Sequence, residues 1–265
     1  GQPASPQAGD YSAWKEALLA ELRRISFRTI PAVMIEGRKL RDPTDLLVGL
    51  NRYETDPGIA VETLWQLPRT GVAKQIRLAV VLDDAEWPMK FDAPETAAEP
   101  TVWLRPRGTG VTQWTRKNPP NYVERSHVLL GQTVDTGRVR DVLAMTHHLR
   151  TRFPEAKISV EGSGSAGIIA AYAALLDPAI AAVELKNPPA THQSNDAPQF
   201  LNVLRVADIP VALGLLAPRP LSISTDQPTA FRLTKDIYVA AGMPAAVSFK
   251  TEPKTARSSR RERSP

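Results

Sequence analysis

The chain has 265 residues, of which 42% are hydrophobic and 23% are charged, and this suits one large α/β domain or two small ones. It contains no cysteine, which excludes disulfides, cysteine nucleophiles and cysteine metal sites. It has no run of apolar residues long enough to predict a membrane span.

The net charge of +5 is unevenly distributed, because residues 251–265 contribute +3 of it. We interpret 251–265 as a disordered basic tail, since its charges lack the interleaved aromatic residues that favour nucleic-acid binding. Residues 1–10, with prolines among small and polar residues, are predicted to be a disordered N-terminus. The folded domain is therefore predicted over 11–250, with no nucleic-acid partner.

Apolar spacing predicts helices where it recurs every three or four residues, and strands where it alternates or runs continuously. In the first half we predict a helix over 11–25, an extended segment over 27–35, a helical turn over 42–50, strands over 59–68, 73–82 and 101–104, a loop over 111–136 and a helix over 138–153. In the second half we predict strands over 158–160, 181–185, 220–224 and 246–249, with helices over 170–176 and 229–241 and a helical stretch that ends near 217. This alternation predicts an α/β fold, with a mainly parallel central sheet and helices on both faces.

Between the strand at 158–160 and the helix at 170–176 lie the residues Gly162-Ser163-Gly164-Ser165-Ala166-Gly167. This composition is typical of a strand that turns sharply into a buried helix, where the two chains approach closely. It is similar to a nucleophile elbow, G-x-S-x-G, although it does not match this pattern fully.

Two registers fit the elbow. The first makes Ser165 the nucleophile, with Ser163 in place of the first glycine. The second, which we favour because the small residues on both sides fit it, puts Gly164 at the apex where the nucleophile would stand. A third interpretation is a G-x-G-x-x-G dinucleotide loop with Glu184 as its acid; this is weaker, because that fingerprint belongs to the first strand–helix unit of a fold.

Four stretches occur together in one order: Asp56–Pro68, Arg105-Pro-Arg-Gly-Thr-Gly110, the elbow at 162–167, and 204–221 with its Ala-Pro-Arg-Pro-Leu. On these stretches the chain resembles the α/β hydrolases of the acetyl xylan esterase and dienelactone hydrolase-like group, over roughly 11–250. The resemblance implies an α/β-hydrolase fold and a serine esterase for carbohydrate acetyl groups or other small esters. It implies no cofactor and no metal, and a triad in the order serine, acid, histidine.

The acid of that triad maps to Asp226, after the strand predicted at 220–224; a simple turn aspartate is the alternative. No triad histidine is recognisable, because all four histidines precede Asp226: His127, His147, His148 and His192. For His192 a surface loop histidine is favoured over a substitute base. The neighbours His147 and His148 are predicted mid-helix, where adjacent residues do not share a face for a metal.

The oxyanion side also departs from the resemblance, since Asp83-Asp84 stands where many relatives have His-Gly. Two carboxylates would repel a developing oxyanion, so a solvated loop pair is the favoured interpretation. For a carbohydrate ligand, four aromatic residues offer stacking surfaces, with core packing as the default for each: Trp87, Trp103, Trp114 and Tyr122.

We therefore predict an α/β-hydrolase-fold protein related to carbohydrate acetyl esterases, with an incomplete triad and impaired or no catalysis, as a pseudoenzyme or one module of a longer chain. The alternative is an active serine carboxylic-ester hydrolase that uses Ser165 and Asp226 with an unrecognised base. Its substrate would be a small ester or an acetylated carbohydrate. A periplasmic or secreted location follows from the resemblance alone.

Overall fold

The computed structural model describes residues 6, 9–31, 38–39, 48–68, 73–88, 100–113 and 120–251. The disorder predicted for 1–10 and 251–265 falls almost wholly outside these residues, and so does Trp114. No helix in the described ranges is both long enough and apolar enough to cross a membrane.

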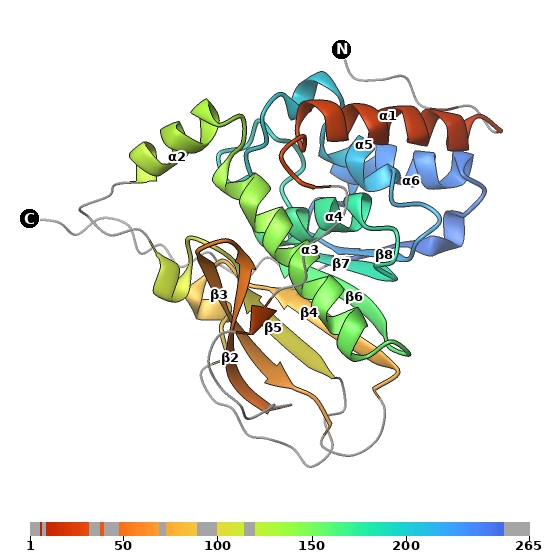
Figure 1. Cartoon of the computed structure of the whole chain (residues 1–265). Coiled ribbons are helices and arrows are strands. Elements are labelled where there is room, and N and C mark those ends of the chain that lie inside the picture. The colour runs from red at the N-terminus through yellow and green to blue at the C-terminus, as the bar shows by residue number, and fades with distance from the viewer. Residues whose placement is uncertain are drawn as a thin grey trace, which may run out of the picture.

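A sheet of nine described strands runs through the molecule in the order β1-β2-β3-β5-β4-β6-β7-β8-β9 (Figure 1). The pairs β1–β2, β2–β3 and β3–β5 are antiparallel, and every pair from β5 to β9 is parallel. The sheet is therefore mainly parallel, as predicted. The strands are β1 (Arg38–Lys39), β2 (Val48–Asp56), β3 (Ile59–Gln66), β4 (Gln75–Val80), β5 (Thr101–Arg105), β6 (Lys157–Ser163), β7 (Ala182–Lys186), β8 (Leu221–Ser224) and β9 (Val247–Lys250).

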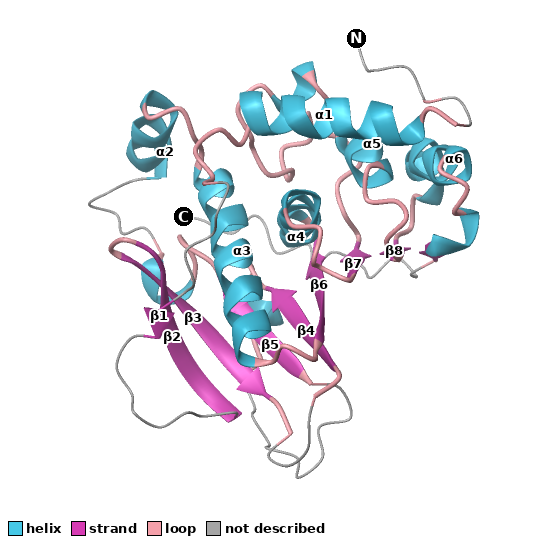
Figure 2. Cartoon of the chain, turned by 45° about the vertical axis from the view of Figure 1, so that its right-hand side comes forward, coloured by secondary structure: helices cyan, strands magenta, loops and turns pink. Residues whose placement is uncertain are grey.

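The helices follow from the same pattern of apolar positions. They are α1 (Tyr11–Ile25), α2 (Pro120–Leu129), α3 (Val134–Arg152), α4 (Ser165–Leu176), α5 (Ile209–Gly214) and α6 (Arg232–Ala240). Helices α1, α3, α4, α5 and α6 gather on one face of the sheet (Figure 2), whereas α2 projects at its rim. The described helices thus differ from the prediction of helices on both faces.

Helix α4 lies at the centre of the core. All its residues from Ala166 to Leu176 are buried, because the helix carries small or apolar residues on every side. It packs on β4, β6 and β7, and α1, α3 and α5 pack on it in turn. Only Ser165, at its first turn, lies outside this buried set.

The strands beneath these helices have one apolar face and one polar face. In β6, Ile158 and Val160 are buried under the helices, whereas Ser159 and Glu161, which alternate with them, are only partly buried. The same alternation continues in β7 and β8. Because successive side chains of a strand point to opposite faces, the described helices cover the apolar face.

The structure differs from three predictions in the first half. The loop predicted over 111–136 contains α2 and the start of α3. The extended segment predicted over 27–35 is a series of turns at 27–30, and the helical turn predicted over 42–50 is strand at 48–50; residues 32–35 and 42–47 of these two predictions lie outside the described residues. In β2 the buried positions include Asn51 and Thr55, so its polar residues concealed the alternation of a strand. In α2 the exposed Leu129 and Leu130 broke the helical apolar pattern.

Candidate functional site

The turn between β6 and α4 is the most tightly packed part of the site. A Cβ atom on Gly162 would lie 2.6 Å from the backbone of Ala166 and Gly167, and a Cβ on Gly167 would lie 2.7 Å from the carbonyl oxygen of Gly162. Real Cβ atoms do not approach other atoms so closely. Strand and helix therefore meet here at a distance that only glycine permits.

Gly164 stands at the tip of this turn with φ +54° and ψ −127°. Its peptide N–H donates to the carbonyl oxygen of Lys186 at 2.8 Å, which ties the turn to the end of β7. A Cβ atom at Gly164 would meet no atom within 4 Å. A side chain at position 164 would therefore have free space, but its backbone would be strained by the positive φ.

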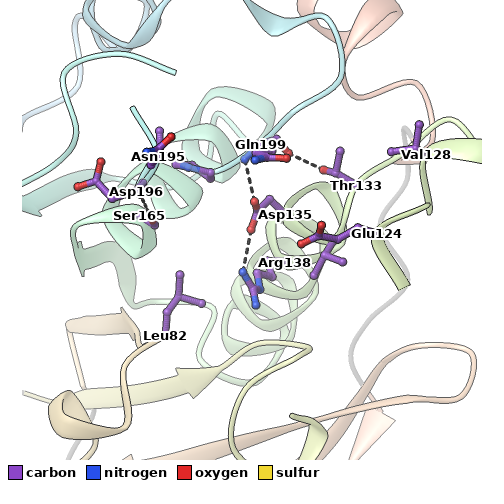
Figure 3. Close-up of a pocket in the computed structure, with 13 residues that line it drawn as sticks. Leu82, Glu124, Val128, Thr133, Asp135, Arg138, Ser165, Asn195, Asp196 and Gln199 are labelled. Carbon is purple, nitrogen blue, oxygen red and sulfur yellow. Dashed lines mark hydrogen bonds and ion pairs between the residues drawn. The ribbon is translucent and has the colours of Figure 1, made fainter. Parts of the chain in front are cut away.

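Ser165 is the first residue of α4, one position beyond the tip. Its hydroxyl donates a hydrogen bond to the carbonyl oxygen of Asp196, in the loop 187–199 that follows β7 (Figure 3). Ser165 therefore binds a peptide oxygen rather than an imidazole nitrogen.

A cleft of about 220 Å³ opens beside Ser165 at the carboxyl ends of the strands. Loop 187–199 forms one wall, the region from α2 to the start of α3 forms the other, and Leu82 lies between them (Figure 3). The lining residues are Leu82, Glu124, Val128, Thr133, Val134, Asp135, Arg138, Ser165, Asn195, Asp196, Ala197, Pro198 and Gln199.

The two walls are joined by hydrogen bonds around Asp135. Its carboxylate accepts from the guanidinium of Arg138 at 2.9 Å and from the peptide N–H of Gln199 at 2.8 Å. The hydroxyl of Thr133 donates to the carbonyl oxygen of Gln199 at 2.6 Å. These bonds use only the backbone of Gln199, which is itself one of the residues that line the cleft.

The Arg-Gly-Thr-Gly motif at 107–110 lies behind the cleft as a structural charge centre. Arg107, 6% exposed, binds Asp141, 0% exposed, through its backbone N–H and two guanidinium nitrogens at 2.7–3.0 Å. Burial lowers the pKa of Arg107, but Asp141 and Asp56 more than offset this, so the pKa stays above its usual value. The carbonyl oxygen of Arg107 accepts from Arg138 Nε at 3.0 Å, which holds Arg138 at the rear of the cleft.

Asp226 lies in a bend after β8 and is exposed to solvent. It makes no hydrogen bond or ion pair within the described ranges, and it is not among the residues that line the cleft. No described hydrogen bond or ion pair joins Asp226 to Ser165.

None of the four histidines lines the cleft as described. In α2, His127 binds the carbonyl oxygen of Val123 through Nδ1 at 2.8 Å. His147 and His148 lie in α3, where His148 packs 4.7 Å from the ring of Tyr53. His192 is in loop 187–199, with Nδ1 3.0 Å from the carbonyl oxygen of Pro198 and Nε2 2.8 Å from the Tyr172 hydroxyl.

Asp83 and Asp84 are exposed and serve local structure. The Asp83 carboxylate accepts from the backbone N–H of Ala85, as an N-cap of the short 3₁₀ turn Asp84–Glu86. Asp84 accepts from Arg105 at 2.7 Å, and the Arg105 guanidinium stacks 4.1 Å above the Trp87 ring. Both carboxylates are therefore solvated and belong to a loop, as interpreted from the sequence. The face of the Trp87 ring is covered by the Arg105 guanidinium.

Of the other aromatic candidates, Trp103 is partly buried in β5 and Tyr122 is 63% exposed on α2; neither lines the cleft. Glu184 lies in the middle of β7, paired in register with Glu161. A dinucleotide site needs its acid at the carboxyl end of a strand, so this position does not suit that interpretation. Among the described residues, no three histidine or acidic side chains are grouped as a metal ion would require.

No family model matches the chain, and no curated protein matches it in sequence. Solved structures do match it. A candidate acetyl xylan esterase from Bacteroides fragilis has a TM-score of 0.72 and 13% identity, over 95% of this chain and 77% of that one. The chain has the α/β-hydrolase fold.

Two further α/β-hydrolase structures support this assignment. A methylesterase matches with a TM-score of 0.65 and 14% identity over 92% of this chain, which spans 59% of that protein. A carbohydrate esterase family 15 glucuronoyl esterase from Caldicellulosiruptor kristjansonii matches with a TM-score of 0.61 and 12% identity, over 93% of this chain and 81% of that one. At these identities the likeness establishes the fold of these carbohydrate esterases.

Sequence reasoning missed the residues that join the cleft walls: Asp135, Arg138 and Gln199. A signal for the first two was present, because Thr133 caps α3 by accepting from the N–H of Thr136 at 3.0 Å. A threonine followed by an acidic residue in the first turn marks a helix start. Starting α3 at Val134 rather than 138 would have put Asp135 on its first turn, with Arg138 three residues further along.

Proposed function

We propose that this α/β-hydrolase domain binds an ester-bearing ligand, an acetylated carbohydrate or a similar small ester, without hydrolysing it through a serine triad. The observation that carries the proposal is the glycine at the tip of the elbow. Gly164 has the positive φ and the open space above it that a nucleophile would use, but it has no side chain to react.

The neighbouring serine does not replace it. The Ser165 hydroxyl already donates to the Asp196 carbonyl oxygen, an acceptor that cannot serve as a general base. A functional nucleophile needs a base within hydrogen-bond reach, and that base needs an orienting acid. His192 has both ring nitrogens engaged elsewhere, and Asp226 is exposed without a partner in the described ranges.

The choice of ligand rests on the cleft and on the folds it resembles. Amide and hydroxyl groups of Asn195, Gln199 and Ser165 stand beside the apolar Leu82 and Val128. Small-molecule sites commonly combine a few polar groups with an apolar lining. The similar structures are named as esterases of carbohydrates, so an ester ligand is the first to test.

The proposal is tested by calorimetric titration with acetylated and deacetylated xylo-oligosaccharides. We expect binding of the acetylated form, weakened about tenfold by Gln199→Ala, which removes roughly one hydrogen bond to the ligand. This substitution keeps both backbone bonds of residue 199. Gln193→Ala is the matched control, because Gln193 is exposed in the same loop but does not line the cleft. Equal affinities for all three proteins would refute the cleft as the binding site.

A further inference from the structure

Loop 187–199 supplies the wall of the cleft formed by Asn195–Gln199. Hydrogen bonds join its two ends to the body of the protein: the peptide N–H of Asn187 donates to the Ser224 carbonyl oxygen, and Gln199 bonds to Thr133 and Asp135. Between the ends, Ser165 binds the Asp196 carbonyl oxygen, and further contacts lie at His192, a residue type whose usual pKa is near neutrality.

The imidazole of His192 is held from three sides. Its ring packs against Tyr172 of α4 at 5.5 Å and against Phe200 at 5.6 Å, measured between ring centroids. The peptide N–H of His192 donates to Asp208, the N-cap of α5, at 2.8 Å. Asp208 also accepts from the Thr191 hydroxyl at 2.6 Å, so the loop is docked to α5 immediately beside the ring.

These partners fix the protonation state that fits. A carbonyl oxygen only accepts, so Nδ1 carries the hydrogen and donates to Pro198. Nε2 is then the acceptor for the hydroxyl of Tyr172, which is 1% exposed. The neutral ring has one donor and one acceptor, and both are satisfied. A proton on Nε2 would point at the Tyr172 hydroxyl, whose own hydrogen would then have to turn away. No other acceptor for that hydrogen is found among the described residues.

The charges that face the ring do not reverse this preference. Burial lowers the pKa of His192 below 6.5, although the Pro198 carbonyl and the carboxylates of Asp208 and Asp135 act in the opposite direction. Burial likewise raises the pKa of Tyr172, so its hydroxyl keeps its proton. A lowered folded pKa stabilises the docked loop above pH 6.5, and that contribution is lost as the pH falls below it.

We propose that His192 is a proton-operated latch: protonation of its ring releases loop 187–199 and opens the wall of the cleft. Release makes the ring accessible to water and frees the Pro198 carbonyl, which lies in the same wall as Asn195 and Gln199. Release of the loop follows from the contacts of His192 alone. Its consequence, weaker ligand binding in mildly acidic solution, rests on the proposed function.

The test is hydrogen exchange, read by mass spectrometry at pH 7.5 and 5.0 and corrected for the intrinsic pH dependence of exchange. In the wild-type protein we expect the opening equilibrium of peptides from 187–199 to rise by up to about 30-fold at pH 5.0, the limit for a group of unfolded pKa about 6.5. Peptides from the buried middle of α3 are the internal reference. In His192→Gln the excess at pH 5.0 should vanish, whatever the exchange of that variant at pH 7.5.

The matched control is His127→Gln, which removes a histidine that also bonds through Nδ1 but lies in α2 outside the loop. It should keep the wild-type pH response. A loop whose corrected exchange is the same at both pH values, or a response that persists in His192→Gln, would overturn the latch. No ligand is used in this experiment, so a negative result leaves the proposed function unaffected. Conversely, absence of ligand binding at pH 7.5 would refute the proposed function without bearing on the release of the loop.

Discussion

The turns that follow β6 and β8 stand at the same edge of the sheet, yet they are built in opposite ways. The turn after β6 is packed so tightly that Gly162 and Gly167 leave no room for a Cβ, and its tip is bonded to β7. The turn after β8 leaves Asp226 exposed and without a partner among the described residues. In a working triad both turns would be constrained by the same hydrogen-bonded chain of side chains.

The difference separates what the fold requires from what the chemistry requires. The close approach of β6 and α4 buries α4 and is needed for stability whether or not a reaction occurs. The exposed Asp226 carboxylate, without a bonding partner among the described residues, has no such structural role. Its turn therefore stays solvated.

The sharpest way to test the first turn is Gly162→Ala. The new methyl group would overlap backbone atoms of α4 at 2.6 Å, and these cannot move without shifting the helix. We expect a loss of about 3 kcal/mol in the free energy of unfolding, measured by urea denaturation. A loss below about 1 kcal/mol would show that the strand and helix are not in contact as described.

Gly164→Ala separates backbone strain from crowding at the same turn. No atom lies within 4 Å of the added Cβ, so only the positive φ of +54° opposes the substitution. The expected loss is about 1–2 kcal/mol, smaller than that for Gly162→Ala. Gly58→Ala is the matched control, because Gly58 also has a positive φ, of +75°, with no atom within 4 Å. A loss for Gly164→Ala well above that for Gly58→Ala would contradict an open space over the tip.

Asp226→Ala tests the second turn and should have the smallest effect. An exposed carboxylate without a bonding partner in the described ranges contributes little, so we expect a change within about 0.5 kcal/mol in the free energy of unfolding. Any ester hydrolysis should be equally unaffected. A large loss of activity in this variant would instead make Asp226 a member of a triad.

Much of the fold could be predicted from sequence, because the buried strands from β4 to β9 and helix α4 are short apolar runs separated by turn residues. The sharp turn from β6 into α4 could be predicted for a local reason, since its close approach needs small residues such as Gly162 and Gly167. The cleft could not. Asp135 and Gln199 are far apart in sequence, and their contact depends on how α3 and loop 187–199 are placed by the whole sheet.

Burial of polar side chains explains why strand β2 was not predicted. In β2, Asn51 and Thr55 are buried, and Thr55 donates to the deeply buried Asp141. Periodicity in apolar residues alone cannot detect a strand whose inward side chains are polar and paired. His192 was predicted to be a surface loop histidine; it does lie in a loop, but its ring is partly buried against Tyr172 and Phe200. These contacts come from a tertiary arrangement that no local pattern encodes.

The central claim is that the cleft binds without serine-triad hydrolysis, and hydrolysis of p-nitrophenyl acetate by the purified wild-type chain and by Ser165→Ala tests it most directly. Both proteins are first shown to be folded by circular dichroism. We expect no rate above buffer for either, because Gly164 offers no nucleophile and Ser165 has no base. Hydrolysis by the wild type that disappears in Ser165→Ala would contradict the account and make Ser165 the nucleophile of an active esterase.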